Sequence, residues 1–554
     1  MRGLRPHFIA LLGLACVIAV VFRFPSLDNR ILWEDESISV LRAAGYTDAQ
    51  FVRTFDDGRV HKVREMRVYQ GHGSRQGAAA VIHSAQAEDP QHPPLYYLML
   101  HFWQYFFDGS ILWQRVLSVL IGIVLIPAMY WLCKELFDNR RTAAIGATLI
   151  AISPFFVAYS RELRDYGLLA LCAVVSGALL LRAQKVSSAP LWVLYAASVA
   201  AGLYANVLFA LVLCGHVAYL TGTAKRHELR LGLAAVVAAV ILYLPWIFTL
   251  CSRAHIVMTA NDWSGSPWPI DMLLGKWLFN TGTAFFDLEY RWLWGMVVLF
   301  PILLVLAYAV YFTAMNATSR QKWFIAGMVI PSAVTFGLSD LLWHAHRSAV
   351  TRYGVFFYLG LLLCMTLLLG YQTATSRRKV WQAVTLSIVA AGLACCIVSS
   401  QSPVWWDNHE DDSIAPVAAR INAASSPVIV APAPWGLIYA LSFRLEDNVE
   451  VMLRYASSKP LSLAPSGQFF IVTTGNQFEI YMKQQRGIST RPLYLASYEP
   501  VWEAFHRPLS RPDSRAAGAS DVKLSMWRVL CGKRLCYTEH SRENPRNARA
   551  SILH

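Results

Sequence analysis

The sequence predicts an α-helical polytopic membrane protein with about eleven transmembrane helices, a long first outer loop with interfacial helices, and a small C-terminal extracytoplasmic α/β or α+β domain. Of the 554 residues, 55% are hydrophobic and only 15% are charged, a composition too apolar for a soluble globular protein. The apolar residues gather in runs of roughly 17 to 25, the length that crosses a bilayer. After about residue 401 these runs give way to shorter segments of strand character.

The first apolar run extends from Phe8 to Phe22, after a basic start at Arg2 and Arg5. No cleavage motif of small residues follows it, so we predict an uncleaved first helix rather than a signal peptide. With this helix included, the predicted spans are 7–24, 111–132, 142–158, 166–182, 190–207, 208–222, 231–250, 292–314, 323–342, 353–371 and 380–399.

Residues 93–107 are apolar and aromatic, but the segment is short for a span. If it lies flat as an interfacial helix, the basic loops alternate in side along the chain, as the positive-inside rule requires. The cytoplasmic loops are then those with Arg2 and Arg5, Lys134, Arg140 and Arg141, Arg182 and Lys185, Lys225, Arg226 and Arg230, Arg320 and Lys322, and Arg377, Arg378 and Lys379.

This orientation places residues 25–110 outside as one loop, with the helix ends near 159–166 and 343–353 on the same face. We predict a transmembrane domain over residues 1–400, a periplasmic domain over 401–530, and a polar tail over 531–554. In the tail, Cys531 and Cys536 either form a disulfide or remain free thiols.

Three adjacent acids, Glu34, Asp35 and Glu36, follow the first helix. Adjacent carboxylates repel one another, and such groups serve as general bases or metal ligands. The alternative is a solvated helix N-terminus, where acids suit the helix dipole. Both interpretations stay open on this motif alone.

His92, followed by two prolines, begins the predicted interfacial helix, since proline fits a first helical turn. Such an N-terminus can bind an anion, with His92 as a hydrogen-bond donor. The alternative is an ordinary helix start with an interfacial histidine.

Four charges, Arg161, Glu162, Arg164 and Asp165, lie between two apolar spans with almost no loop. Charges at the membrane edge are costly unless they pair or face an aqueous cavity, so they are candidates for function. A salt bridge between Arg161 and Asp165 is the structural alternative.

Near the predicted tenth span, His344 and His346 precede Arg347, Arg352 and Tyr353. Guanidinium groups match phosphate oxygens. The two histidines could instead be half of a metal site, but they do not share a helix face and no third ligand is evident. A divalent metal is therefore possible but not indicated, and no cofactor is required.

The net charge of +14 does not indicate nucleic acid, because the basic residues fall in short clusters that orient the chain and contact membrane lipids. The sequence has no Walker motif, no Gly-rich dinucleotide fingerprint and no Gly-x-Ser-x-Gly elbow. A cytosolic nucleotide donor is therefore not indicated.

Over roughly residues 1–375 the chain resembles the class C glycosyltransferases of the protein O-mannosyltransferase and aminoarabinose (lipid A) transferase type, in their bacterial branch. The motifs that carry this resemblance are WEDES, HPPLYYLMLHFW, YSRELRDYGLLAL and TRYGVFF, in this order. It implies a multi-pass enzyme of the bacterial inner membrane that moves a hexosyl or pentosyl group from a polyprenyl-phosphate carrier. The acceptor would be a lipid, glycan or protein on the periplasmic side.

The resemblance also implies roles for single residues. It places Asp35 at the reaction centre as the base of an inverting displacement, with Glu36 beside it to contact the acceptor or assist. Glu34 is not part of the family pattern, and its role stays open.

For the carrier phosphate, the resemblance implies contacts from His92, Arg161, Arg352 and Tyr353, and the chemistry of Arg347 fits the same task. Where the aminoarabinose transferases have lysine before the two prolines, this chain has histidine. Further candidates for the site are Glu34, Asp165, His344 and His346.

Three other functions compete with this interpretation. A transporter or flippase of lipid-linked sugars would use the same arginines, but it does not need an acidic cluster and often shows paired, interrupted helices. A polymerase of lipid-linked sugars is a neighbouring enzyme class. A plain membrane anchor has no use for charges at so many helix ends.

Overall fold

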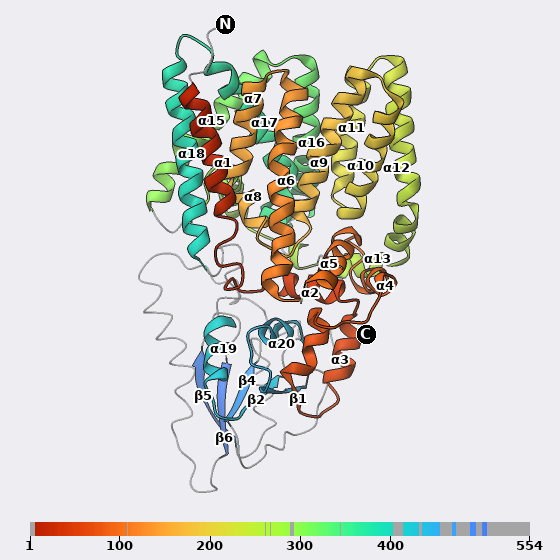
Figure 1. Cartoon of the computed structure of the whole chain (residues 1–554), viewed down its shortest axis with the longest axis vertical. Coiled ribbons are helices and arrows are strands. Elements are labelled where there is room, and N and C mark those ends of the chain that lie inside the picture. Colours follow the sequence, from red (N-terminus) through yellow and green to blue (C-terminus); the bar gives the residue numbers. More distant parts are fainter. Residues whose placement is uncertain are drawn as a thin grey trace.

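The computed structural model describes residues 6–107, 109–260, 262–265, 267–288, 293–343, 345–402, 414–431, 435–454, 468–472, 488–494 and 501–506. The apolar helices form one bundle, and the short helices of the first loop and a β-sheet lie beyond one end of it (Figure 1). The bundle consists of α1 (Pro6–Val21), α6 (Ile111–Phe137), α7 (Arg140–Ile152), α8 (Pro154–Tyr159), α9 (Tyr166–Val186), α10 (Ala189–Ala205), α11 (Phe209–Thr223), α12 (Arg226–Ser252), α15 (Leu293–Asn316), α16 (Ser319–Trp343), α17 (Val355–Gln372) and α18 (Arg378–Gln401).

Among the described residues, seven helices are long and apolar enough to cross a membrane, and three shorter apolar helices accompany them. The chain is therefore a multi-pass membrane protein, as predicted. The predicted spans all fall on helices, but how many of them cross the bilayer remains a prediction.

One predicted span, 142–158, is in fact two helices. Helix α7 ends at Ile152 and α8 begins at Pro154, with the backbone of Ser153 extended between them. Proline has no N–H to donate and disfavours a helical conformation in the residue before it, so the helix breaks there. After the break, the chain continues through α8 to the charged segment 160–165, which contacts α2 at the end of the bundle that faces the sheet.

Close packing between α11 and α16 depends on two glycines. Gly215 and Gly327 face each other, and a Cβ on either residue would collide with the backbone of the other. In a bilayer, helices associate through such close backbone approach rather than through hydrophobic burial.

Short helices cover the end of the bundle that faces the sheet. Helix α5 has a buried side with Tyr96, Tyr97 and Leu100 and an exposed side with Phe102 and Phe106. This two-sided pattern fits the predicted interfacial helix over 93–107. The short helices are α2 (Glu34–Ala43), α3 (Asp48–Phe55), η1 (Val63–Gln70), α4 (Ala78–Glu88), α5 (Leu95–Phe106), α13 (Ala254–Thr259), η2 (Asp262–Gly265), α14 (Ile270–Gly282), η3 (Arg347–Ala349) and η4 (Thr351–Gly354).

A mixed sheet lies farther from the bundle, with the order β1-β3-β2-β4-β6-β5. Strand β2 pairs in parallel with β3 and β4, and the other neighbours are antiparallel. The strands are β1 (His61–Lys62), β2 (Pro427–Ala431), β3 (Glu450–Leu453), β4 (Gln468–Val472), β5 (Ile488–Tyr494) and β6 (Val501–His506), and helices α19 (Ile414–Asn422) and α20 (Trp435–Ser442) accompany them. Cys531, Cys536 and the predicted tail lie outside the described residues.

The sheet is not built from the C-terminal part alone, because its edge strand β1 belongs to the first loop. The first loop also shares a hydrophobic core with the C-terminal part: Phe51, Phe55 and Tyr69 pack with Ile438 and Tyr439. The predicted boundary at residue 401 therefore cuts through one packed unit.

We predict that Phe51→Ala loosens both parts of this unit together. Phe51 has no exposed surface, and its ring contacts those of Phe55, Tyr69, Trp435 and Tyr439. Removing a buried phenyl ring costs about 3–5 kcal/mol, so hydrogen exchange should accelerate both in η1 and in β2 and β3. Phe102→Ala, on an exposed ring of α5, is the control. Faster exchange confined to the first loop would contradict the shared core.

Candidate active site

The three adjacent acids occupy the first turn of α2, directly after Trp33, whose backbone is extended. Carboxylates are favourable there, because the unpaired N–H groups of a helix N-terminus carry partial positive charge. Successive helical residues point about 100° apart, so the three side chains meet different surroundings. Each acid therefore has its own structural context.

Glu36 is buried in an ion pair with Arg115 of α6. Arg115 Nη2 lies 2.8 Å from one carboxylate oxygen, and its Nε donates to the other at 3.2 Å. The backbone N–H of Leu163 also donates to Glu36, at 2.8 Å. Arg115 uses its remaining N–H groups for the backbone carbonyls of residues Leu27, Arg30 and Ile31.

Glu36 was predicted to contact the acceptor or to assist Asp35; both roles stay predictions, and the geometry favours assistance. Its side chain is 1% exposed and its oxygens are already held by a guanidinium and a backbone amide. Glu36 joins three separate segments: α2, α6 and the loop that contains Leu163. It is a positioning residue for the site.

Asp35 lies at the accessible side of the same turn. Its carboxylate Oδ2 is 3.7 Å from Arg164 Nη2 and also 3.7 Å from Arg352 Nη2. Its side chain is 32% exposed, which leaves it open to a ligand. Both guanidinium groups also lie over the ring of Trp33, at 6.0 and 5.4 Å from its centroid. One carboxylate and two cations therefore meet around a single indole.

Two further hydrogen-bond donors at this place have no partner among the described residues: Trp33 Nε1 and Arg164 Nε, both buried. Buried donors are nearly always satisfied by protein, water or ligand. With the two guanidinium groups beside them, these donors make the surroundings of Asp35 suited to an anion.

Arg164, not Arg161, is the arginine of the charged segment that faces Asp35. Arg161 donates to the backbone carbonyls of Ser399 and Pro25, at 3.1 and 2.6 Å, and so ties the loop to α18 and to the end of the first helix. Arg164 donates to the Asp35 carbonyl and to Ser39 Oγ. Both guanidinium groups are buried, but only that of Arg164 reaches the carboxylate. Contact of Arg161 with the carrier phosphate stays a prediction, and the geometry favours Arg164 for that role.

His92 reaches the site through Arg164. Its Nδ1 is 2.8 Å from an oxygen of Asp89, and its Nε2 is 3.1 Å from Arg164 Nη2. A guanidinium only donates, so Nε2 accepts and the proton of the neutral imidazole is on Nδ1. The Tyr97 hydroxyl donates to the other oxygen of Asp89 at 2.6 Å. The chain of Asp89, His92 and Arg164 therefore orients the guanidinium.

Burial disfavours the imidazolium of His92 and is the largest single effect on its pKa. The charge of Asp89, its hydrogen bond to His92 and the charge of Asp165 together outweigh burial and raise the pKa of His92 above its ordinary value. Protonation would convert Nε2 from an acceptor into a donor that opposes Arg164. The contact between His92 and Arg164 is thus present above the pKa of His92 and lost as the pH falls below it.

Arg352 comes from η4, at the start of α17. The Tyr353 ring stacks on Phe336 of α16 with centroids 5.3 Å apart, and Arg352 lies 5.8 Å from the Tyr353 ring centroid. These contacts fix the late arginine-tyrosine motif at the same end of the bundle as α2. The structure thus brings Arg352 and Tyr353 together with Asp35.

Arg347 and His346 are held by other neighbours. The backbone N–H of Arg347 donates to Asp340, and its guanidinium contacts Ser339 at 3.4 Å. His346 is buried and stacks on Trp268, with centroids 4.6 Å apart. His344 lies outside the described residues. Within the described part of the chain no cluster of three or more His, Cys, Asp or Glu residues could hold a metal ion.

Asp165 is buried behind the site rather than exposed to it. It accepts a hydrogen bond from Asn206 Nδ2 at 2.8 Å, whereas Arg161 binds backbone carbonyls. The alternative of an Arg161–Asp165 salt bridge is therefore replaced by separate contacts. Glu34, the first of the acids, turns away from the bundle toward Gly436 of α20.

Sequence reasoning missed several residues of the site. Arg164 belongs to the same charged segment as Arg161, which was predicted to contact the carrier phosphate. Trp33 belongs to the WEDES motif, but no role was predicted for it. Asp89 precedes His92 by three residues, a spacing that could have suggested its contact. Arg115 carried a weaker signal: a single cation near the start of an apolar span.

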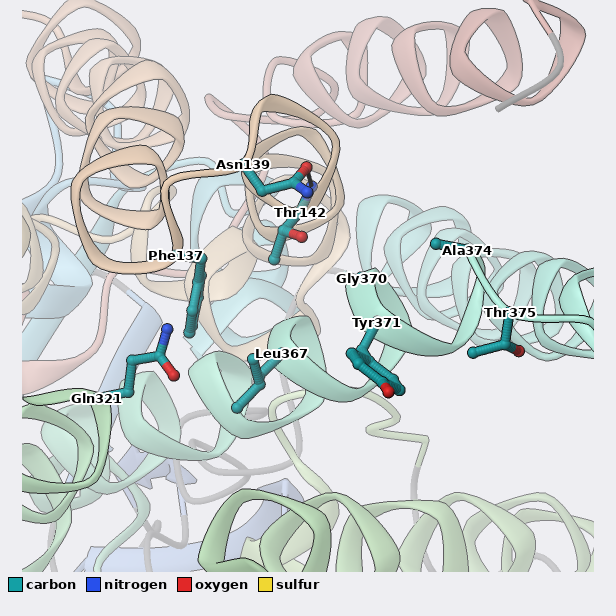
Figure 2. Close-up of a pocket in the computed structure, with 9 residues that line it drawn as sticks. All are labelled: Phe137, Asn139, Thr142, Gln321, Leu367, Gly370, Tyr371, Ala374 and Thr375. Carbon is teal, nitrogen blue, oxygen red and sulfur yellow. Dashed lines mark hydrogen bonds between the residues drawn. The ribbon is translucent and has the colours of Figure 1, made fainter. Parts of the chain in front are cut away.

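A cavity lies elsewhere in the bundle. It has a volume of about 350 Å³ and is lined by Phe137, Thr142, Gln321 and Tyr371, among others (Figure 2). These residues lie where α6 and α17 end and α7 and α16 begin. Helix α6 starts beside Glu36 and ends at this cavity, so its 27 residues place the cavity about 40 Å from the acids. It is not part of the site around Asp35.

Comparisons with known proteins match both a segment and the fold. Residues 91–248 match the family model of dolichyl-phosphate-mannose-protein mannosyltransferase. This segment contains His92 and Arg164 but not Asp35 or Arg352. No curated protein matches the chain by sequence.

The fold is similar to that of ArnT from Cupriavidus metallidurans in its crystal structure bound to undecaprenyl phosphate, with a TM-score of 0.53 and 14% identity over 91% of this chain and 99% of that chain. The crystal structure of the same ArnT in the apo state matches with the same values. The oligosaccharyltransferase of Archaeoglobus fulgidus in complex with Zn and sulfate has a TM-score of 0.47 and 12% identity, over 86% of this chain and 70% of that chain. The fold expected from the resemblance to class C glycosyltransferases is confirmed by the match to ArnT.

We expect Glu36→Gln to destabilise the protein by about 3–5 kcal/mol, because it leaves the buried charge of Arg115 without its counter-charge. Denaturant unfolding in detergent measures the loss. Glu65→Gln, at an exposed acid of the same loop, should change the stability by less than about 1 kcal/mol. If the two variants unfold alike, the ion pair does not hold the site together.

We expect Asp89→Asn to lower the pKa of His92, because the variant removes the charge and the charged hydrogen-bond partner that raise it. NMR of ¹³C-labelled histidine, with a His92→Gln sample to assign the signal, follows the titration. Tyr97→Phe keeps the carboxylate and should leave most of the shift in place. Unchanged titration of His92 in Asp89→Asn would show that Asp89 does not control its charge.

Proposed function

We propose that this protein is a glycosyltransferase that takes a sugar from a polyprenyl-phosphate carrier and transfers it to an acceptor at the outer face of the membrane. The observation that carries the proposal is the position of Asp35, whose accessible carboxylate lies 3.7 Å from each of two guanidinium groups at one end of the bundle. A base beside an anion site is what displacement of a phosphate by a hydroxyl or amine requires.

The phosphate of the carrier is assigned to Arg164 and Arg352. Both side chains are largely buried, at 4% and 16% exposure, so their charges act in surroundings of low dielectric constant. Trp33 Nε1 and Arg164 Nε are additional donors at the same place. ArnT, whose fold this chain shares, was crystallised with undecaprenyl phosphate, which supports a carrier of this chemical class.

Asp35 is assigned as the base. It removes the proton of the acceptor hydroxyl or amine while that atom forms a bond to the anomeric carbon. The bond from this carbon to the phosphate oxygen breaks at the same time, and the polyprenyl phosphate leaves with the bonding electrons. A single displacement of this kind inverts the anomeric configuration, and the two arginines stabilise the charge that the phosphate gains.

We assign α2 and the sheet to the outer face of the membrane. The charge pattern of the loops supports this assignment, because the basic loops are expected in the cytoplasm. For a bacterial inner membrane this is the periplasmic face. Profiling of the glycolipids and glycans of a deletion strain would identify the sugar and the acceptor.

We expect Asp35→Asn to lower the rate of sugar transfer by about 10²- to 10⁴-fold, because the amide cannot take up the proton. The assay uses membranes supplied with polyprenyl-phosphate-linked sugars, and immunoblotting confirms equal protein levels. Asp57→Asn, at an acid of the same loop paired with His61, is the matched control and should transfer normally. Full transfer by Asp35→Asn would exclude it as the base.

In the same preparations, we expect Arg352→Ala to weaken the binding of polyprenyl phosphate that carries no sugar. Arg53→Ala, at an exposed residue of α3, should not weaken it. Equal binding by both variants would remove Arg352 from the phosphate site.

A further inference from the structure

Helix α20 of the C-terminal part lies against the start of α2. Figure 1 shows α20 between the sheet and α2, and the two helices are in contact. The contact is close at Gly436, the second residue of α20, where an added Cβ would collide with the carboxylate of Glu34. Glycine at this position thus makes room for an acid that comes from the first loop, about 400 residues earlier in the chain.

The place that Glu34 occupies suits a carboxylate. The first backbone N–H groups of a helix have no partner within the helix, and the helix dipole makes this end partly positive. Glu34 itself is the first residue of α2, so its side chain connects the first turns of two helices. The neighbouring residue in that turn of α2 is Asp35.

Helix α20 is fixed independently to the first loop. The Tyr439 hydroxyl donates to the carbonyl of Tyr69 at 2.7 Å, and Gln70 Nε2 donates to Ser442 Oγ at 2.8 Å. Just beyond the helix, Arg444 donates to the carbonyl of Arg30 at 2.9 Å. The carbonyl of Arg30 also accepts from Arg115, the partner of Glu36.

The segment from Arg30 to Glu36 is therefore held from two directions. Arg115 of the membrane bundle holds Arg30 and Glu36, and the C-terminal part holds Arg30 through Arg444 and lies against Glu34 at the start of α20. Asp35 lies between Glu34 and Glu36 and has no such anchor of its own beyond the two arginines. Its orientation depends on both neighbours.

We propose that Glu34 is a positioning residue, held on the N-terminus of α20, through which the C-terminal part of the chain sets the orientation of Asp35 toward Arg164 and Arg352. This inference rests on the proposed function for its readout. It gives the C-terminal part a role in the transfer step itself, in addition to any role in acceptor choice.

The test is a double-mutant cycle on Glu34 and Gly436. Glu34→Ala removes the carboxylate, and Gly436→Ala displaces it with a methyl group. Each variant should lower kcat about 5- to 50-fold, because misplacing a reacting group by a fraction of an ångström has effects of this size. The affinity for polyprenyl phosphate should stay within about twofold of wild type, since Arg164 and Arg352 are intact. Combining the two should cost no more than Glu34→Ala alone, because no carboxylate is left to displace.

Glu34→Gln separates charge from shape and keeps the test usable if a larger change impairs folding. The amide retains the size of the side chain but not its charge, so kcat should fall between those of wild type and Glu34→Ala. Asp447→Asn is the matched control: it weakens the exposed pair with Arg67 at the same interface, without touching the first turn of α2, and should leave kcat unchanged.

Two results would overturn the proposal: wild-type kcat in Glu34→Ala, or losses of Glu34→Ala and Gly436→Ala that multiply in the double variant. Hydrogen exchange of α2 provides a readout that needs no transfer assay, and it should accelerate in Glu34→Ala but not in Asp447→Asn. If the wild-type protein transferred no sugar, the proposed function would fail while this exchange difference still decided whether Glu34 couples α20 to α2.

Discussion

The buried ion pair between Glu36 and Arg115 is the interaction on which the candidate site depends. An unpaired charge in such surroundings is costly, so each partner needs the other, and their additional hydrogen bonds satisfy the remaining donors and acceptors. Through these bonds α6 holds the backbone of residues 27–31, the first turn of α2 and the amide of Leu163 in one arrangement. Leu163 directly precedes Arg164, so the same pair that places Asp35 also places one of the two cations beside it.

The side chains of the three adjacent acids point in three directions, so each one has different neighbours. Glu36 points into the bundle and holds it together, Glu34 points toward α20, and Asp35 faces two guanidinium groups with its carboxylate partly exposed. The helix geometry explains why a run of like charges is tolerated here: the three side chains point in different directions, Glu36 toward Arg115, Asp35 toward Arg164 and Arg352, and Glu34 toward α20. In the proposed mechanism, Asp35 acts as the base while its two neighbours stay in place.

Much of the architecture could be predicted from the sequence, because bilayer-spanning helices leave a strong signal in apolar runs and basic loops. The interfacial helix and the grouping of Asp35, His92 and Arg352 on one face followed from the same pattern. The edge strand β1 could not be predicted, because two residues far along the chain from their partner β3 leave no periodicity. That Arg164 rather than Arg161 faces Asp35 could not be predicted for a similar reason: the segment is not a regular helix, so spacing does not tell which guanidinium faces the acids. The burial of Glu36 depends on a single distant arginine, which local sequence does not reveal.

The central claim is that the carrier phosphate lies beside Asp35, between Arg164 and Arg352. A cryo-electron microscopy structure of the protein in a lipid nanodisc with polyprenyl phosphate tests it directly. The account predicts phosphate density within about 3 Å of both guanidinium groups, with Glu36 still paired to Arg115. Phosphate bound at the other end of the bundle, or at this end without contact to either arginine, would contradict it.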